Sequence, residues 1–319
     1  MGEEVERITD MKKYKKPLIG FIGQGFVGKS YADDFELRGH KVVRYSLEEP
    51  YRANKKRIKD CDIVFIAVPT PTVLSEARAN GGRPQTRFDC SIVEEALTLV
   101  GVGKTAVIKS TILPGTTRQL QKKFPKLFVM HSPEFLVLKN ASEDAARPLR
   151  NIIGIPKKTA AFISRAKTVL QMLPKAPYES ICIAEEAELV KYAGNFFLYL
   201  KVLFANSIYD TAAAVGANYE VVRASIAADP RIGSSHLQVL HDSGHRGAKR
   251  GRGAGGVCFI KDIAAFADLY ERSVHDPWGS TFIRATIEKN IDLLMRSGKD
   301  LDLLLGVHGA SALARHKKR

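Results

Sequence analysis

The sequence has few cysteines, no long apolar run and no internal repeat, and each absence excludes a class of protein. Its four cysteines, Cys61, Cys90, Cys182 and Cys258, lie far apart and lack the spacing of metal ligands. We therefore expect reduced thiols rather than a disulfide framework. No apolar stretch approaches the ~18 residues that span a bilayer, and the acidic-then-basic N-terminus has no signal-peptide core. These features predict a cytoplasmic protein without a membrane partner.

Acidic residues are in deficit, since Lys and Arg number 49 against 34 Asp and Glu and the formal net charge is +15. The excess gathers in the runs 12–16, 52–59 and 246–252 and in the tail 315–319. Such a balance predicts anionic partners, but the runs lack the interleaved aromatic residues of nucleic-acid modules. The run His245–Arg252 leads directly into a glycine-rich loop, where phosphates of a substrate could sit. The predicted partner is therefore an anionic small molecule rather than a nucleic acid.

The first half of the chain has the pattern of an α/β protein. With 319 residues, 45% of them hydrophobic, the chain can bury a large core and is expected to form two domains. Up to residue 183, strand signals alternate with helix signals, which is typical of a Rossmann-type doubly wound parallel sheet. The expected strands are 18–22, 41–45, 62–68, 105–109, 127–131, 151–155 and 180–183. The apolar run Ile63–Val68 predicts a central strand buried on both faces, ending at the edge where cofactor and substrate meet.

The second half changes to helical spacing. From Glu185 to Ala214 one apolar face is expected, formed by Leu189, Ala193, Phe196, Leu200 and Leu203. A further helix of about 20 residues is framed by Asp276 as N-cap, Pro277 in the first turn and Gly298 after its end. We therefore expect a Rossmann domain at 1–183 and, at 184–319, a long linking helix followed by an all-helical domain. Apolar surface on both long helices would favour a homodimer through this second domain.

A dinucleotide fingerprint follows the first expected strand. The apolar run Leu18–Ile22 leads into Gly23-x-Gly25-x-x-Gly28 and then a helical segment. Gly23 would make the tight turn, Gly25 would let a pyrophosphate reach the backbone, and Gly28 would let helix and strand pack closely. The phosphates would lie at the helix N-terminus. The pattern predicts NAD or NADP as cofactor.

The position that usually selects between these two cofactors is ambiguous. An acid that would bind the ribose 2′-hydroxyl is expected just beyond the second strand, but Ser46 stands there. The basic side chains of Arg44, Arg52 and Lys55 could tolerate a 2′-phosphate, so NADP remains an alternative to NAD. A solvated basic loop explains the same residues equally well.

A thiol on a glycine-rich loop is the strongest catalytic candidate. Residues 253–262 read GAGGVCFIKD, so Cys258 follows four small residues and precedes Lys261 and Asp262. A cysteine attacks as its thiolate, and we expect a nearby cation to lower the pKa of Cys258 while the glycines let a substrate carbon approach. The alternative is a small buried hydrophobic residue on a loop.

Other polar residues fall where reacting groups are expected. Lys191 and Asn195 are four apart, so on a helix they share one face and could together point at a developing oxyanion. Thr111 and Glu134 each follow a strand, at the sheet edge, although turn or cap roles would explain them too. His236, His241 and His245 lie in a loop without a carboxylate at helical spacing, and we expect no metal site there.

Seven motifs in order resemble the UDP-glucose and GDP-mannose dehydrogenase family, whose members oxidise a nucleotide sugar to its uronic acid. Besides the glycine fingerprint they are 64–71 (VFIAVPTP), 109–117 (KSTILPGTT), 132–136 (SPEFL), 188–195 (ELVKYAGN), 229–233 (DPRIG) and 255–262 (GGVCFIKD). The resemblance covers about residues 17 to 275. It implies a UDP-glucose 6-dehydrogenase-like enzyme with an NAD-binding domain.

The resemblance also implies a role for each matching residue. Cys258 would trap the aldehyde from a first oxidation as a thiohemiacetal, and the thioester formed by a second would be hydrolysed. Lys191 and Asn195 would stabilise oxyanions, while Glu134 and Thr111, with a water ordered by Asp262, would serve hydrolysis. The implied cofactor-binding residues are Gly23, Gly25, Phe26, Val27, Gly28, Ser46, Val68, Pro69, Thr70, Ser110, Thr111 and Lys261. The implied substrate-binding residues are Glu134, Phe135, Leu136, Lys191, Asn195, Arg231 and Gly255, with Arg231 reaching across a dimer in some members.

The chain departs from the family pattern in several places. It stops before the third, nucleotide-clamping domain that the family usually carries, and is expected to be a short form. Val257 and Ile260 replace a serine and a proline beside the cysteine, and Leu138 and Lys139 alter the loop after Phe135. Two alternatives remain open. One is a two-electron dehydrogenase of a small hydroxy acid or phosphorylated sugar, and the other is a non-catalytic dinucleotide-binding partner of another protein or a polyanion.

Overall fold

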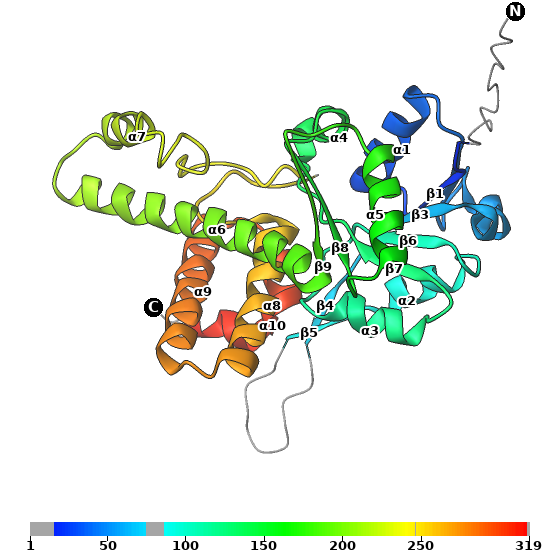
Figure 1. The fold of residues 1–319 in the computed structure, drawn as a ribbon. Coiled ribbons are helices and arrows are strands. Elements are labelled where there is room, and N and C mark those ends of the chain that lie inside the picture. The colour runs from blue at the N-terminus through cyan, green and yellow to red at the C-terminus, as the bar shows by residue number, and fades with distance from the viewer. Residues whose placement is uncertain (1–15, 75–85, 246, 318–319) are drawn as a thin grey trace, which may run out of the picture.

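A seven-stranded sheet organises the first half of the chain in the computed structural model, which describes residues 16–74, 86–245 and 247–317 (Figure 1). The strand order is β2-β1-β3-β6-β7-β8-β9. The strands are β1 (Ile19–Ile22), β2 (Val42–Tyr45), β3 (Ile63–Ile66), β6 (Thr105–Ile108), β7 (Phe128–His131), β8 (Arg150–Ile155) and β9 (Tyr178–Ile183). All seven strands that the sequence predicts are present, with ends that differ by up to two residues.

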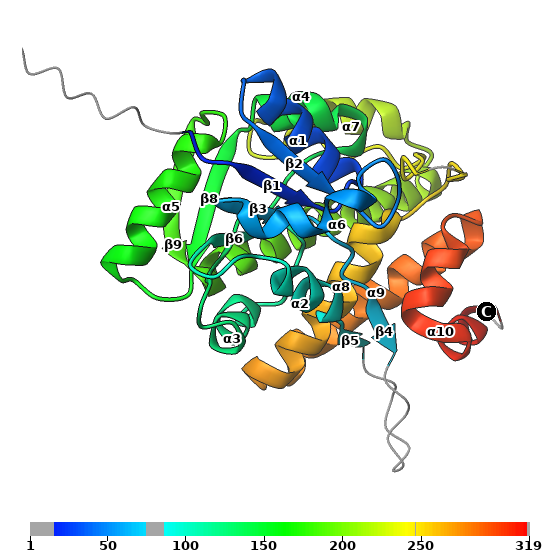
Figure 2. The same cartoon turned by 90° about the vertical axis from the view of Figure 1, so that its right-hand side faces the viewer.

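Helices cover both faces of this sheet, which confirms the doubly wound architecture (Figure 2). They are α1 (Phe26–Leu37), α2 (Ser91–Thr98), α3 (Thr116–Lys123), α4 (Ala141–Ala146) and α5 (Ala160–Met172), with 3-10 turns η1 (Arg52–Asp60) and η2 (Leu138–Asn140). Strand β3 is buried on both sides. Val64 and Ile66 join the hydrophobic cluster on one face, and Ile63 and Phe65 join the cluster on the other.

The expectation of a wholly parallel sheet is wrong at one junction. Strand β8 pairs with β7 in the antiparallel direction, and β9 then runs parallel to β8. The connection between β7 and β8 contains only the short turn η2 and the six-residue helix α4, which is about 9 Å long and too short to return the chain across the sheet. Strand β8 therefore starts near the carboxyl edge and runs back.

A small hairpin lies outside the main sheet and was not expected from the sequence. Strands β4 (Thr72–Leu74) and β5 (Thr86–Phe88) pair in the antiparallel direction. The hairpin follows the carboxyl end of β3 and contacts helices α8 and α10 of the second half. It therefore connects the sheet edge to the helical part of the molecule.

In the described residues, the regular structure of the second half is helical, apart from an isolated β-bridge between His241 and Gly251 in the segment that joins α7 to α8. It comprises α6 (Ala184–Ala214), α7 (Tyr219–Ala227), α8 (Gly256–Val274), α9 (Pro277–Ser297) and α10 (Leu301–Lys317). The expected caps of α9 are confirmed, because the Asp276 side chain accepts from the Trp278 amide and Gly298 adopts a left-handed φ of 66°. No helix in the described ranges is both long and apolar enough to cross a membrane.

The expected apolar face of α6 is confirmed in its second part, where Phe196, Leu200 and Leu203 pack into a hydrophobic cluster, but not in its first turns. Leu189 and Ala193 are exposed, whereas the polar side chains of Glu188, Lys191 and Asn206 are buried. The apolar periodicity misplaced this face because the buried polar residues have hydrogen-bond partners elsewhere in the fold, which removes the cost of burying them.

The two halves meet where β9 ends and α6 begins. Figure 1 shows α6 starting beside β8 and β9 and extending away from the sheet toward α7. The division into domains at residues 183 and 184 stays a prediction. The expected basic runs 12–16 and 315–319 fall partly outside the described residues, as does Arg246.

Candidate active site

The glycine turn between β1 and α1 has the sterics of a phosphate-binding loop. Gly23 has a φ of +91°, and a Cβ there would lie 2.2 Å from the Ala67 carbonyl oxygen. A Cβ on Gly28 would lie 2.0 Å from the Gly23 carbonyl oxygen, whereas one on Gly25 would meet nothing within 4 Å. The N-terminus of α1 carries no side-chain cap, so its first amides are available. The space beside Gly25, the residues Phe26 and Val27 and the free amides fit a dinucleotide pyrophosphate.

The neighbouring strand ends are joined by side-chain hydrogen bonds. The Ser110 hydroxyl accepts from the Val68 amide at 3.0 Å and donates to the Val68 carbonyl at 2.7 Å. The Thr70 hydroxyl donates to the Thr111 carbonyl at 2.9 Å. The segment containing Pro69 is thus held beside the glycine turn at the point where strand order reverses, between β1 and β3. Five predicted cofactor-binding residues are brought together here.

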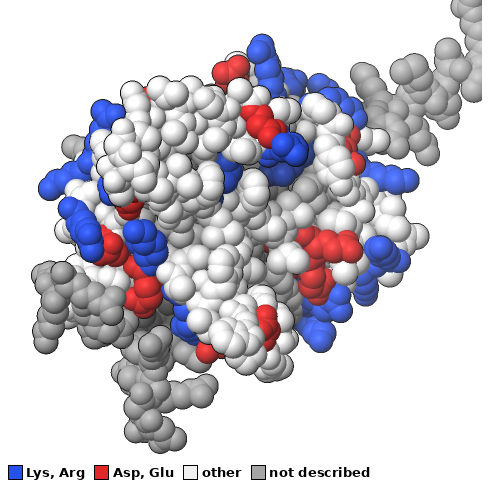
Figure 3. All heavy atoms as spheres, turned by 90° about the vertical axis from the view of Figure 1, so that its left-hand side faces the viewer, with Lys and Arg blue, Asp and Glu red and all other residues white. Residues whose placement is uncertain are grey.

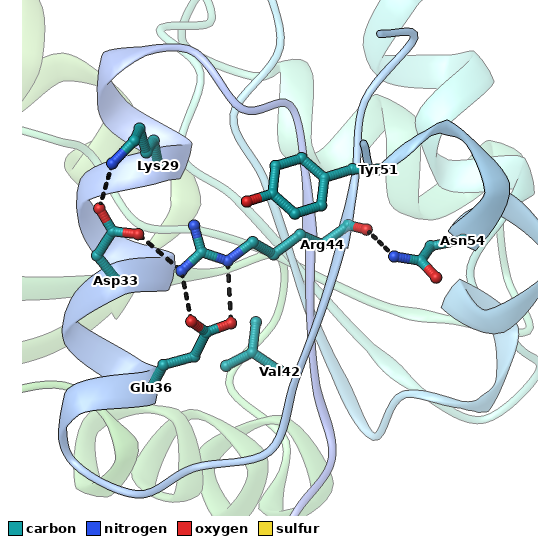
Figure 4. A pocket seen from close by; sticks show the side chains of 7 residues that line it. All are labelled: Lys29, Asp33, Glu36, Val42, Arg44, Tyr51 and Asn54. Carbon is teal, nitrogen blue, oxygen red and sulfur yellow. Dashed lines mark hydrogen bonds and ion pairs between the residues drawn. The ribbon is translucent and has the colours of Figure 1, made fainter. Parts of the chain in front are cut away.

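Beside β2, Arg44 is paired with carboxylates and is not a free cation for a 2′-phosphate (Figure 4). Its guanidinium binds Glu36 through two hydrogen bonds of 3.0 and 2.7 Å and lies 2.7 Å from Asp33. These groups, with Tyr51 and others, line a cavity of about 350 Å³. Ser46 donates to the Glu48 carbonyl at 2.7 Å. Of the three cations that could support NADP binding, Arg44 is excluded by this pairing.

Two linked polar pairs surround the cysteine. The Lys191 ammonium, on α6, donates to the Glu134 carbonyl at 2.9 Å and to its carboxylate at 3.1 Å. One turn later, Asn195 donates to Asp262 at 2.7 Å, and Lys261 donates to the other oxygen of Asp262 at 2.6 Å. Cys258, on the first turn of α8, is exposed as a residue, while its thiol is partly enclosed and lies within the electrostatic reach of all four charged groups. Residues from the sheet edge, α6 and α8 thus converge.

The thiol pKa moves in the direction opposite to the expected one. Burial of the thiol away from water raises the pKa of Cys258. The charges of Asp262 and Glu134 add to this, while Lys191 and Lys261 act against it. The cations do not prevail because each already pairs with a carboxylate. At neutral pH the resting form of Cys258 is therefore the thiol, and its proton must leave when the sulfur attacks.

Lys191 is a cation rather than a base. Burial alone would lower its pKa, but the charges of Glu134, Cys258 and Asp262 outweigh burial and raise the pKa of Lys191. A buried ammonium with a fixed direction fits stabilisation of an oxyanion better than proton abstraction.

The remaining predicted substrate residues divide into two groups. The Lys191 ammonium lies 5.8 Å from the centre of the Phe135 ring, and the Leu136 amide donates to Glu134 at 2.9 Å, so both belong to the cluster. Gly255 lies at the start of α8, where a Cβ would be 2.1 Å from the Asp300 carboxylate. Arg231 does not join the cluster, because its exposed guanidinium pairs with Asp229 at 2.6 Å just after α7.

Part of the expected phosphate-binding run has a structural role instead. Arg252 pairs with Asp210 at 2.7 Å and donates to the buried Asn206 at 2.8 Å, which anchors the loop to α6. Within the described ranges, His236, His241 and His245 do not assemble with other ligands into a group that could hold a metal ion.

Sequence reasoning missed the role of Glu188. This buried carboxylate on α6 accepts from the Gly115 amide at 2.6 Å and from the amide and hydroxyl of Thr117 at 2.8 and 2.6 Å. It thereby fixes the start of α3, in the motif that contains Thr111. Burial raises the pKa of Glu188 to about 7. Its spacing of three residues from Lys191 was the available signal, since both then lie on one helix face.

Comparisons with known proteins agree with this geometry. Residues 51–173 match the NAD binding domain of the UDP-glucose/GDP-mannose dehydrogenase family, and residues 185–291 match its central domain. The UDP-glucose 6-dehydrogenase of Rhizobium meliloti is 33% identical in an alignment of 222 residues that covers 66% of this chain and 46% of that protein. That of Rickettsia bellii is 31% identical in an alignment of 312 residues that covers 85% of this chain and 66% of that protein.

Solved structures show the same likeness. The UDP-glucose dehydrogenase of Pyrobaculum islandicum superposes with a TM-score of 0.71 at 27% identity, covering 88% of this chain and 70% of that one. A 3-hydroxyisobutyrate dehydrogenase of Mycobacterium tuberculosis, 16% identical with a TM-score of 0.62, shares the fold over 92% of this chain and 99% of that one. The chain spans about half the length of the first two curated relatives that it matches. With both family domains matched in order, the chain belongs to the UDP-glucose/GDP-mannose dehydrogenase family.

Proposed function

We propose that the protein oxidises the primary alcohol of a nucleotide sugar such as UDP-glucose to the uronic acid, in two steps at Cys258. The observation that carries the proposal is the convergence of Lys191, Asn195, Glu134 and Asp262 around the thiol of Cys258. The names of the relatives support the substrate class, and the open space at Gly25 supports the cofactor.

Bound NAD would accept one hydride in each of the two oxidations, using two molecules of NAD per sugar. In the first, the alcohol loses its proton together with the hydride and becomes an aldehyde. As the Cys258 sulfur bonds to the aldehyde carbon, the thiol proton passes to a carboxylate of the cluster and the carbonyl oxygen takes the negative charge, which gives a thiohemiacetal alkoxide near Lys191 and Asn195. The second hydride leaves from this carbon to give a thioester, and water hydrolyses it to the acid and the free thiol.

The carboxylates of Glu134 and Asp262 would carry out the proton transfers in this scheme. Glu134 and Asp262 lie on two sides of the cluster, each held by a cation, so each can position a water near the thioester carbon. Thr111, beside Glu134 at the sheet edge, would complete this water site. The exposure of Cys258 leaves room for the sugar carbon to approach its thiol.

The test is to count NAD reduced per sugar consumed, with UDP-glucose, UDP-N-acetyl sugars and GDP-mannose as candidates. We expect two NADH per sugar for the wild type, and a Cys258→Ala variant that no longer forms the acid although it still binds NAD. One NADH per sugar with an active Cys258→Ala variant would contradict the proposal.

That second result would favour a two-electron dehydrogenase of a small hydroxy acid or phosphorylated sugar. The fold shared with 3-hydroxyisobutyrate dehydrogenase over nearly all of that chain keeps this alternative in view. Binding of NAD without any turnover would favour a non-catalytic dinucleotide-binding protein. The proposal also includes a cytoplasmic location, with which the free cysteines agree.

We further propose a homodimer through the helical half. Figure 3 shows the end of the molecule that carries α7, where uncharged side chains fill the centre and many of the Lys and Arg side chains lie nearer its rim, despite the net charge of +15. Apolar side chains of α6 that include Phe197 and Phe204 are exposed, as are Trp278 and Phe282 on α9. Phe197→Glu should yield a monomer by light scattering, whereas Leu37→Glu on the exposed side of α1 should not. A dimeric Phe197→Glu protein would place the interface elsewhere.

A further inference from the structure

The loop that carries Cys258 is held by side chains from the end of α9 and the turn that follows it. We call these four residues, Asn290, Ser297, Lys299 and Asp300, the clasp. Each of them hydrogen bonds to the backbone of the segment 252–256. The clasp therefore fixes the loop through contacts that are 36 to 46 residues apart in the sequence.

Most clasp contacts lie before the helix that carries the thiol. Asn290 binds both polar groups of Ala254, accepting from its amide at 2.7 Å and donating to its carbonyl at 3.0 Å. The buried Lys299 donates to the Gly253 carbonyl at 3.0 Å. Ser297 accepts from the Arg252 amide at 3.0 Å. These three residues fix the approach of the loop, and Asp300 acts on the first residue of α8 itself.

Asp300 binds the amide of Gly256, two residues before Cys258, at 2.7 Å. The same carboxylate oxygen accepts a short hydrogen bond from Ser243. The other oxygen lies 3.7 Å from His245 and has no hydrogen-bond partner among the described residues. Because no side chain caps α8 at Gly255, Asp300 takes the place of an N-cap from another part of the fold.

The backbone of Asp300 is strained. Its φ is +52°, in the left-handed region that residues other than glycine seldom adopt. Such conformations persist where surrounding contacts impose them, and they are common at functional sites. Here the strain places a fully buried carboxylate directly under Gly255, so close that a Cβ on that glycine would overlap it. The loop and the carboxylate therefore fit only in one arrangement.

We propose that Asp300 is a positioning residue for Cys258. By holding the Gly256 amide it sets the first turn of α8, and so the place of the sulfur relative to Lys191 and Asp262. This inference rests on the proposed function, because the sulfur needs an accurate position only if it attacks a bound aldehyde. Asp300 itself lies behind the loop and bonds to its backbone rather than to the groups that surround the thiol.

The test uses Asp300→Ala, Asp300→Asn and, as a matched control on the same stretch, Asp292→Ala, which removes only an exposed pair with Arg296. Alkylation of Cys258 by iodoacetamide is followed by peptide mass spectrometry without sugar, and acid formation and NAD affinity are measured in parallel. For Asp300→Ala we expect alkylation about fivefold faster, because the loosened thiol leaves its crowded position. Acid formation should fall at least tenfold in kcat, with the Kd for NAD within twofold of wild type.

Asparagine keeps an acceptor for the Gly256 amide, so Asp300→Asn should recover acid formation to within about threefold of wild type. If Asp300 had only a general structural role, its loss would neither speed Cys258 alkylation nor lower kcat selectively, and wild-type alkylation with wild-type kcat in Asp300→Ala would overturn the proposal. If the alanine variant does not fold, amide exchange over 254–260 decides. Asp300→Gly suits the left-handed backbone at this position and removes the acceptor, so less protection there than in Asp292→Ala supports the proposal, and equal protection overturns it. If wild type forms no acid, the proposed function fails, while alkylation and exchange still decide the role of Asp300.

Discussion

The two glycine-rich segments of the site, the turn at 23–28 and the loop at 251–256, are fitted to their surroundings in different ways. A Cβ on Gly23 or Gly28 would strike backbone carbonyl oxygens of the turn or the adjacent strand end. A Cβ on Gly251, Gly253 or Gly255 would instead strike side chains of the clasp or its neighbours, such as Ser297, Asn290 and Asp300. The first segment is shaped by the backbone and the second by side chains.

This difference explains why the function of the first segment can be recognised from the sequence and that of the second cannot. A turn that packs on its own backbone needs glycine at fixed spacing, so its function can be recognised from the sequence of the six residues 23–28 alone. A loop that packs on distant side chains has glycines with no spacing rule of its own. Substitutions in the clasp can therefore change the reactivity of Cys258 without affecting the cofactor site, and three measurements test that separation.

The largest loss of stability and of NAD binding is expected where an added side chain would clash with a backbone carbonyl group. Gly28→Ala places a methyl group 2.0 Å from a carbonyl oxygen, and should cost roughly 3 kcal/mol of stability and abolish NAD binding. Gly25→Ala meets nothing within 4 Å, so it should keep the wild-type Tm and lose affinity only. Thermal melts and NAD titrations measure both. Wild-type affinity in Gly25→Ala would show that the pyrophosphate does not lie against that residue.

Acid should weaken the sheet half through His131, which is fully buried at the end of β7. Burial, with the Lys109 charge acting in the same direction, lowers the pKa of His131 to about 3. Between the unfolded pKa of about 6.5 and this value, only the unfolded chain takes up the proton, so stability falls as pH falls. Between pH 7 and pH 4 the free energy of unfolding should therefore fall by roughly 3 kcal/mol more in the wild type than in a His131→Leu variant, at about 1.4 kcal/mol per pH unit. Urea unfolding at pH 7 to 4 tests it, and parallel curves for both proteins would refute it.

Substitution of a clasp residue should change the reactivity of the Cys258 thiol and leave NAD binding unchanged. Asn290→Ala leaves the amide and carbonyl of Ala254 buried without partners, at a cost of about 2 kcal/mol. Cys258 alkylation should change while NAD affinity stays at the wild-type value, with Asp292→Ala as control. A loss of NAD affinity in Asn290→Ala would mean that the two glycine segments are coupled after all.

The smallest effect is expected for a substitution at the sheet edge, which should weaken NAD binding and leave the Cys258 thiol unchanged. Ser110→Ala removes the hydroxyl that binds both polar groups of Val68, and should cost about 1 kcal/mol. NAD affinity should fall a few-fold and Cys258 alkylation should not change. Calorimetric titration and peptide mass spectrometry give the two numbers, and altered alkylation would argue against the separation.

Short-range patterns were enough for much of the fold. The seven strands, the glycine turn and the caps of α9 follow from apolar runs, steric demands and capping residues that lie within a few positions of each other. The spacing of Lys191 and Asn195 likewise placed both on one face of α6, although the buried polar face itself was not foreseen.

What the sequence by itself determined, then, is the seven strands of the main sheet, the family, and Cys258, Lys191, Asn195, Glu134 and Asp262 as candidates for one site. Only the tertiary structure decided the reversed direction of β8, the capture of Arg44 by Asp33 and Glu36, and the raised pKa of Cys258. It also decided the clasp. Each of these depends on which charges and side chains come together from distant positions in the chain, and local periodicity carries no information about such pairings.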